Sequence, residues 1–165
     1  MPNQNSQQNT AVKMKFPLAE KILMGLGYYA LVITGIYGTY LESITWGVAY
    51  TIFVIFGFSV LLGYCVCTYC PYIYPEYSDC LFPPFGRVVR KLYKFQPGPI
   101  SILDKTGFFI MMVGVVLIPQ YCLLKNYTLL IIFWLFCLPT YAGLILYECK
   151  RCQHFNCIFN RAERH

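Results

Sequence analysis

Two short cysteine-rich segments hold the residue types in this sequence that could bind a metal or do redox chemistry. The first, YCVCTYCP at residues 64–71, contains Cys67-x-x-Cys70, and the second, YECKRCQHFNC at residues 147–157, contains Cys149-x-x-Cys152. A two-residue spacing lets the chain turn so that both sulfurs face one ion, and four thiolates at about 2.3 Å suit tetrahedral zinc. The two pairs together predict a four-thiolate metal centre.

Other residues near the two pairs could enlarge this centre or replace one of its ligands. Cys80 and Cys157 lie within reach of the pairs through a loop, and His154 could add an imidazole beside the second pair. Thiolates also suit iron, alone or in an iron–sulfur cluster. We expect zinc in preference to an iron–sulfur cluster, with the candidate ligands Cys67, Cys70, Cys80, Cys149, Cys152, His154 and Cys157.

The same thiols have alternative uses. Cysteines beside a membrane are sites of S-palmitoylation or simply pack, and close pairs can be redox-active. Cys65 falls in the last turn of an apolar run, while Cys122 and Cys137 lie inside such runs, where a thiol behaves as a small hydrophobe. These three cysteines are therefore weaker candidates as ligands.

The segments that must position the cysteines have the composition of a membrane protein. Of the 165 residues, 58% are hydrophobic and only 12% are charged. A helix needs about 20 apolar residues to cross the hydrocarbon core of a bilayer. Four stretches meet this length, at about 22–41, 46–64, 107–124 and 127–147. The predicted fold is an all-α integral membrane protein, with four transmembrane helices in a bundle.

The basic residues indicate which side of the membrane the cysteine pairs face. Four crossings put the amino terminus, the 65–106 connection and the carboxyl tail on one side, with 12 of the 13 Lys and Arg residues; only Lys125 lies opposite. The positive-inside rule places the crowded side, with both termini, in the cytoplasm. The net charge of +6 then indicates anionic lipid headgroups rather than nucleic acid. Disulfides are not expected in that reducing compartment.

The connection between the second and third spans predicts a helix of its own. Apolar residues recur at helical spacing from Phe85 to Phe95, and four basic residues fall on the other side of the helix. Pro83-Pro84 suits its start and the QPGP segment at 96–99 its end. We expect this amphipathic basic helix to lie on the cytoplasmic headgroups or to dock on a partner protein. Ser101-x-x-Asp104 predicts a cap for the third span.

Some residue types are absent from the predicted spans, and their absence argues against several classes of function. The predicted spans hold no histidine, which excludes a bis-histidine haem between helices, and no mid-depth carboxylate or base, which argues against a proton pump or ion-coupled transporter. Glu76 and Asp79 lack the partners of a catalytic site and are expected to be solvated loop residues. Pro119 and Pro139 are expected to kink the third and fourth spans.

The expected organisation follows from these segments. It comprises a disordered cytoplasmic amino terminus at 1–20, two spans within 21–64, a cysteine-rich cytoplasmic loop at 65–106 with a helix at about 84–95, two spans within 107–147 and a cysteine-rich cytoplasmic tail at 148–165. The leading functional hypothesis is a non-enzymatic accessory or scaffold subunit of a membrane assembly, in which a metal fixes the loop for docking on a protein partner.

Two other function classes stay open. An iron–sulfur cluster would make the protein an electron-transfer module linked to a quinone or a partner. The third class is a membrane thiol–disulfide oxidoreductase. Four spans and cysteine pairs make the chain similar to quinone-linked thiol oxidoreductases of the vitamin K epoxide reductase kind. The active thiols of those enzymes work on the oxidising side, whereas the pairs here fall on the positive side.

Overall fold

The computed structural model describes residues 16–73, 80–96, 98–152 and 157, and in this part of the chain the regular structure is entirely helical. Four helices of 22 to 26 residues are long and apolar enough to cross a membrane: Leu18–Glu42, Ile44–Tyr69, Ile102–Leu123 and Tyr127–Arg151. This confirms the prediction of an all-helical chain with four such spans. Each helix is longer than the apolar window that revealed it, because the helical conformation continues past the hydrophobic residues.

The spans are built from shorter elements. The first span is α1 (Leu18–Glu42), and the second joins α2 (Ile44–Phe56), the π-helix η1 (Gly57–Leu62) and the 3₁₀ turn η2 (Cys67–Tyr69). The third joins α4 (Ile102–Leu117) and α5 (Gln120–Leu123), and the fourth joins α6 (Tyr127–Ala142), the π-helix η3 (Gly143–Glu148) and the 3₁₀ turn η4 (Cys149–Arg151). Because α1 begins at Leu18, residues 18–20 of the predicted disordered lead are helical.

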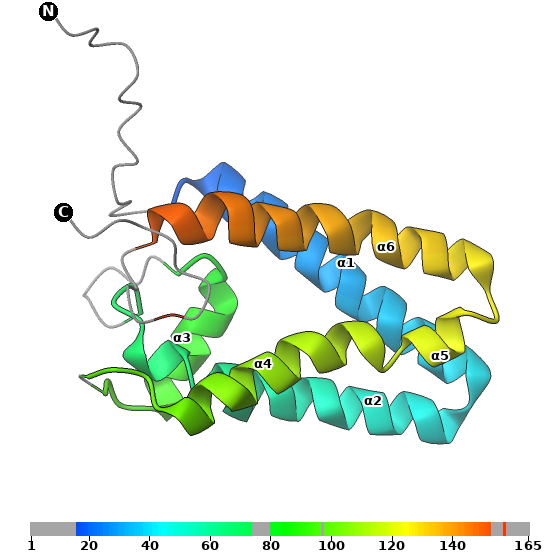
Figure 1. The fold of residues 1–165 in the computed structure, drawn as a ribbon, viewed down its shortest axis with the longest axis horizontal. Helices are drawn as coiled ribbons and strands as arrows, with labels where there is room; N and C mark the ends of the chain where they lie inside the picture. Colours follow the sequence, from blue (N-terminus) through cyan, green and yellow to red (C-terminus); the bar gives the residue numbers. More distant parts are fainter. Residues whose placement is uncertain (1–15, 74–79, 97, 153–156, 158–165) are drawn as a thin grey trace, which may run out of the picture.

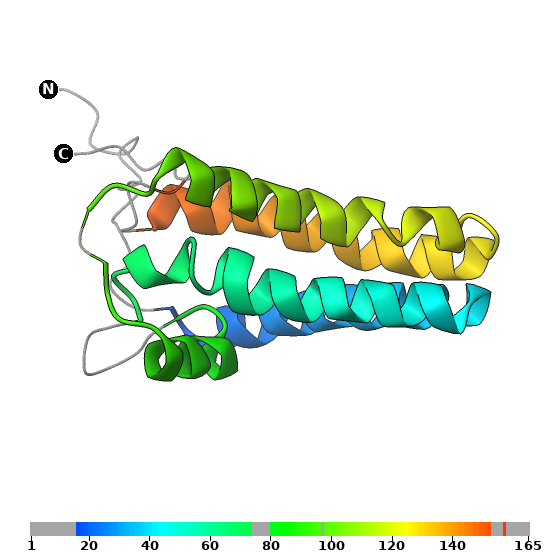
Figure 2. The same ribbon diagram turned by 90° about the horizontal axis from the view of Figure 1, so that it is seen from below.

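The four spans lie side by side with their connections at the two ends (Figures 1 and 2). Helix α1 packs against α2 and α6, and α4 packs against η1. Two tyrosines join α4 to its neighbours: the hydroxyl of Tyr50 in α2 donates to the Val115 carbonyl, and that of Tyr141 in α6 donates to the Met112 carbonyl. The result is a four-helix arrangement with one shared core.

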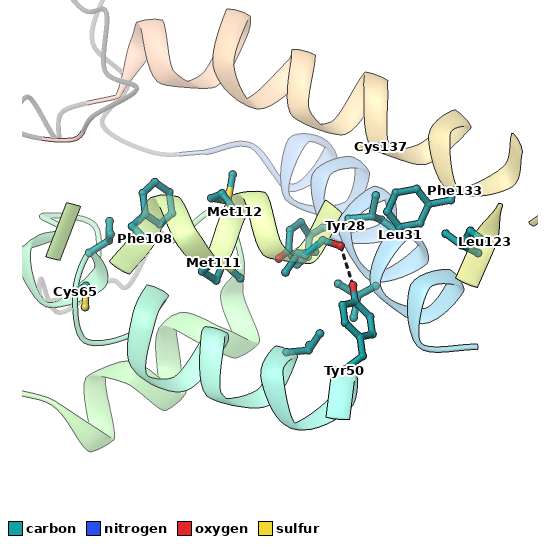
Figure 3. Packing of buried hydrophobic residues seen from close by; sticks show 14 residues of the cluster. Tyr28, Leu31, Tyr50, Cys65, Phe108, Met111, Met112, Leu123, Phe133 and Cys137 are labelled. Atoms are coloured by element: carbon teal, nitrogen blue, oxygen red, sulfur yellow. Dashed lines mark hydrogen bonds between the residues drawn. The ribbon is translucent and has the colours of Figure 1, made fainter. Parts of the chain in front are cut away.

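The core is apolar, and so is the outer surface. Leu31, Tyr50, Met111, Val115 and Phe133 are fully buried in the cluster that Figure 3 shows, which runs from Cys65 at one end to Leu123 at the other. Large apolar side chains also point outward from every span, and the fourth span has the smallest buried share. Apolar residues on both faces of a helix are expected where lipid replaces water as the solvent.

The two prolines affect their spans differently. Helix α4 ends at Leu117 and α5 begins at Gln120, so Pro119 interrupts the third span as expected from its missing N–H. Pro139 lies inside α6, which continues to Ala142. There the departure from α-helical geometry comes one turn later, where the π-helix η3 begins.

The connection between the second and third spans forms α3 (Pro83–Leu92), which ends three residues before the helix predicted at about 84–95. Val89 is buried, while Arg87, Arg90 and Lys91 are exposed. The predicted cap of the third span is confirmed, because the Ser101 hydroxyl oxygen accepts a hydrogen bond from the backbone N–H of Asp104 at 3.1 Å. Figure 1 shows α3 at the same end of the bundle as the start of α1 and the end of the fourth span.

Candidate metal centre

The second and fourth spans deliver their cysteine pairs through the same sequence of backbone conformations. Each changes from an α-helix to a π-helix at a glycine, Gly57 or Gly143, and ends in a 3₁₀ turn whose first residue is the first cysteine of the pair. In the second span a turn at residues 63–66 separates the two, whereas in the fourth span the 3₁₀ turn follows directly. The second cysteine, Cys70 or Cys152, caps that turn in an extended conformation, with φ and ψ of −81° and 121° or −83° and 135°. π-Helical segments occur often at functional sites.

Each glycine that begins a π-helix lies against a methionine of a neighbouring helix. A Cβ atom at Gly143 would lie 2.5 Å from Cε of Met24 in α1, and one at Gly57 would lie 3.0 Å from Cγ of Met111 in α4. Both π-helices therefore pass close to a methionine of a neighbouring helix.

Hydrogen bonds within the turn and to two other parts of the chain hold the turn that carries the first cysteine pair. Within it, the Cys70 N–H donates to the Cys67 carbonyl at 3.1 Å. The Gln96 N–H, beyond α3, donates to the Thr68 carbonyl at 3.0 Å, and the Tyr69 hydroxyl donates to Oδ2 of Asp104 in α4 at 3.0 Å. The turn is thus tied both to the loop that follows it and to the third span.

Six cysteines line a single cavity at this end of the bundle. The cavity has a volume of about 460 Å³, and the six are Cys67, Cys70, Cys80, Cys149, Cys152 and Cys157. Five of them come from the two cysteine-rich segments and Cys80 comes from the loop between these segments, while 78 residues separate Cys70 from Cys149. The fold therefore brings together all six cysteines that the sequence analysis named as candidate ligands.

A negative charge on one thiol would act on thiols of the other segment. Cys67 interacts with Cys70, Cys80 and Cys157. Cys70 interacts with Cys80, Cys152 and Cys157. A charge developed on any one of these sulfurs would be felt by thiols of both segments.

The surroundings of Cys70 disfavour its thiolate form. Desolvation is the largest cause and raises the pKa of its thiol well above the ordinary value of 9.0. Cys80 raises this pKa further, a hydrogen bond from the backbone at Tyr72 lowers it, and Cys152 and Cys157 raise it by smaller amounts. A thiolate here would have to form next to a positive charge, because a cation close to the sulfur offsets the desolvation cost.

The thiols converge without reaching ligand spacing. Among the residues that the structure describes, no group of three or more His, Cys, Asp or Glu side chains is arranged so that it could hold a metal ion. All nine cysteines are in their free form. His154, and with it Glu76 and Asp79, lies outside the described residues. A shared ion would therefore require the sulfurs to move toward one another from the positions seen here.

The remaining cysteines lie apart from the cavity lining. Cys65 is buried near Gly107, where an added Cβ would lie 3.5 Å from its sulfur. Cys122 and Cys137 are buried within the third and fourth spans, and Cys137 belongs to the core cluster. Their positions agree with the packing role that their apolar surroundings suggested.

Two residues of this region were missed by the sequence analysis. Glu148, which directly precedes Cys149, is buried with only 2% of its surface exposed. Tyr28, from the middle of α1, lines the cavity with the cysteines. The sequence does contain a signal for Glu148, because a carboxylate at the end of an apolar run can be recognised. Nothing in the sequence distinguishes Tyr28 from the other 14 tyrosines.

Comparison with protein-family models, with curated proteins and with solved structures finds no match to this chain.

Proposed function

We propose that the six cysteines around the cavity form a binding site for a thiophilic metal, with zinc as the metal, and that the protein is a scaffold subunit of a membrane assembly. The observation that carries this proposal is the convergence of six thiols from distant parts of the chain on one cavity. A thiol that only packs needs no other thiol beside it, whereas zinc coordination needs three or four.

The chemistry of the thiols around the cavity favours a bound cation. The raised pKa of Cys70 means that its thiolate is unstable without a compensating charge. Zinc supplies that charge and deprotonates a coordinating thiol outright. Four thiolates around one Zn²⁺ leave a charge of −2 (2 − 4), and basic residues such as Lys150 and Arg151, next to Cys149 and Cys152 in the chain, can offset it.

A scaffold role follows from what such a metal would connect. The first cysteine group precedes α3, and the second ends the fourth span. A metal between them would lock α3 against the ends of two spans and hold its exposed side chains in one position. We propose that this surface lies on the cytoplasmic side, where it lies on anionic lipid headgroups or docks on a protein partner.

Metal analysis of the purified protein tests the proposal. We expect stoichiometric zinc and no visible absorbance in protein extracted from membranes with a mild detergent. Replacing Cys67 and Cys149 together by Ser should reduce the zinc content to background, because it removes one ligand from each segment. The matched control is the Cys122→Ser, Cys137→Ser pair, which should keep its zinc. Equal zinc in both variants, or none in the unaltered protein, would refute the site.

An iron–sulfur electron-transfer module is the second candidate. It is favoured by the number of thiols, since six exceed the four that one zinc ion uses, and by the apolar space that extends from them into the bundle. A brown protein with iron and acid-labile sulfide would select this function over the zinc scaffold.

The thiol–disulfide oxidoreductase is less well supported. Catalytic cysteines of that class have lowered thiol pKa values, because the thiolate is the nucleophile. Burial raises the pKa of the Cys70 thiol instead. A metal-free protein whose thiols exchange electrons with a quinone would nevertheless select this class.

A further inference from the structure

The cavity continues from the thiols into the membrane-spanning part of the bundle. Beyond the cysteines its walls come from α1, α2, α4 and α6, and include Val32, Val54, Met112 and Tyr141. Its volume of about 460 Å³ falls within the range of small-molecule sites, which is roughly 300–1,000 Å³. An apolar cavity of this kind does not hold water and takes up apolar molecules instead.

Aromatic rings shape one side of the cavity. The Tyr28 ring meets the Phe58 ring nearly at right angles, with centroids 5.2 Å apart, and lies 5.7 Å from the Phe82 ring at 62°. Phe58 in turn contacts Phe85 of α3 at 5.6 Å and 75°. All four rings line the cavity. Rings in such tilted arrangements offer both edges and faces, which are the surfaces that a flat ring packs against.

Tyr28 also carries a hydrogen-bond donor that its surroundings leave unused. Its side chain is 7% exposed, and its hydroxyl is buried with no hydrogen-bond partner among the residues that the structure describes. Two other tyrosine hydroxyls of the bundle, those of buried Tyr50 and partly buried Tyr141, donate to carbonyl oxygens at 2.8 and 3.0 Å. A buried hydroxyl is normally hydrogen-bonded, so an acceptor is expected beside Tyr28.

We propose that this cavity binds a lipid-soluble quinone, with the ring among the four aromatic side chains and one carbonyl oxygen accepting a hydrogen bond from the Tyr28 hydroxyl. A quinone offers a flat ring, an oxygen acceptor and an apolar tail in one molecule. A lipid acyl chain would fill the volume but would leave the Tyr28 hydroxyl without an acceptor. The proposal concerns binding alone and holds whether or not the cysteines carry a metal.

The test measures binding of a matched pair of probes to the full-length protein in nanodiscs. The probes are a benzoquinone with a decyl tail and decylbenzene, which has the same tail and ring size but no oxygen. We expect the quinone to bind the unaltered protein more tightly. Tyr28→Phe should weaken quinone binding about tenfold, the effect of one lost hydrogen bond, and should leave decylbenzene binding unchanged.

Tyr50→Phe is the matched control, because it removes a buried hydroxyl that does not line the cavity. It should leave binding of both probes unchanged. Val32→Phe, which fills the cavity, should weaken both. Equal affinity of the two probes, or equal quinone affinity of the unaltered protein and Tyr28→Phe, would show an acyl-chain site and overturn the proposal. Absence of binding by either probe would also overturn it. Zinc and iron contents are measured on the same samples, so that a failure of quinone binding can be distinguished from a failure of the proposed metal site.

Discussion

The hydroxyl of Tyr50 in α2 donates a 2.8 Å hydrogen bond to the backbone carbonyl of Val115 in α4, across the buried core (dashed line in Figure 3). Val115 lies four residues before Pro119. In an α-helix its carbonyl would accept from the N–H of residue 119, which proline lacks. Tyr50 therefore satisfies the carbonyl that Pro119 leaves without its helical partner. In a bilayer no water can take this place.

Tyr50→Phe should lower the free energy of unfolding by about 1 kcal/mol, because it leaves the Val115 carbonyl without a partner. Denaturant or thermal unfolding in detergent measures the change. In a Pro119→Ala background residue 119 has an N–H again, so Tyr50→Phe should lower the free energy of unfolding by a smaller amount. An equal cost in both backgrounds would show that the hydroxyl does not compensate for the proline. Tyr121→Phe, at an exposed tyrosine, is the control and should have little effect.

The convergence of the cysteines predicts selective cross-linking. In a variant that keeps only Cys70 and Cys152, a short bifunctional thiol reagent should join the two residues, because both line one cavity and their thiols interact. A variant that keeps only Cys122 and Cys70 should not form the link, since Cys122 lies outside that lining. Fragment analysis after cleavage between the second and fourth spans detects the product. Equal cross-linking of both pairs would contradict the packing described here.

The two ends of the bundle should face opposite sides of the membrane. Lys125 lies between α5 and α6, at the other end from the cysteine-rich turns (Figure 1). In a cysteine-free background, Lys125→Cys should react with a membrane-impermeant maleimide in intact cells. A variant that keeps only Cys152 should react only after the membrane is opened, as the positive-inside rule expects. The reverse pattern would place the candidate metal centre on the outer side.

Helix α3 presents two apolar residues to its surroundings. Val88 is 51% and Leu92 is 63% exposed, next to exposed Arg90 and Lys91. If α3 lies in the headgroup region, a tryptophan at position 92 should be quenched by brominated lipids more strongly than one at position 91. The fluorescence of the introduced tryptophan is obtained by subtracting the signal of the unaltered protein, which comes from Trp46 and Trp134. Equal quenching of Leu92→Trp and Lys91→Trp would favour docking of α3 on a protein instead.

An ion pair between Lys125 and Glu42 joins the α5–α6 connection to the end of α1. The hydrogen bond with Glu42 raises the pKa of Lys125 above its ordinary value of 10.5. A raised pKa in the folded state stabilises the protein below pH 10.5, and this contribution is lost as the pH rises through the folded-state pKa. The unfolding midpoint of Glu42→Gln should therefore fall slightly below that of the unaltered protein at pH 9. The two midpoints should converge above pH 10.5.

The size of that effect is limited by exposure. The Lys125 side chain is 57% exposed, so solvent screens the pair, and the shift should shrink further in high salt. A difference between the two proteins that grows above pH 10.5 would contradict the assigned direction.

Much of the architecture follows from the sequence alone. The length and hydropathy of the four apolar stretches identify the spans, because a bilayer of fixed thickness demands a fixed length of helix. The cap at Ser101 and the interruption at Pro119 are also predictable, since each depends on hydrogen bonds within a few residues of the chain. The spacing of Cys67 with Cys70 and of Cys149 with Cys152 makes each pair a visible candidate.

Other features depend on packing between distant segments and could be found only in the folded chain. The π-helices that begin at Gly57 and Gly143 arise where each helix passes a methionine of its neighbour, and no local pattern marks them. The same holds for the bond from Tyr50 to Val115, the burial of Glu148 and the place of Tyr28 in the cavity wall. Local spacing determined which residues could act together, and tertiary contacts decided which of them share a site.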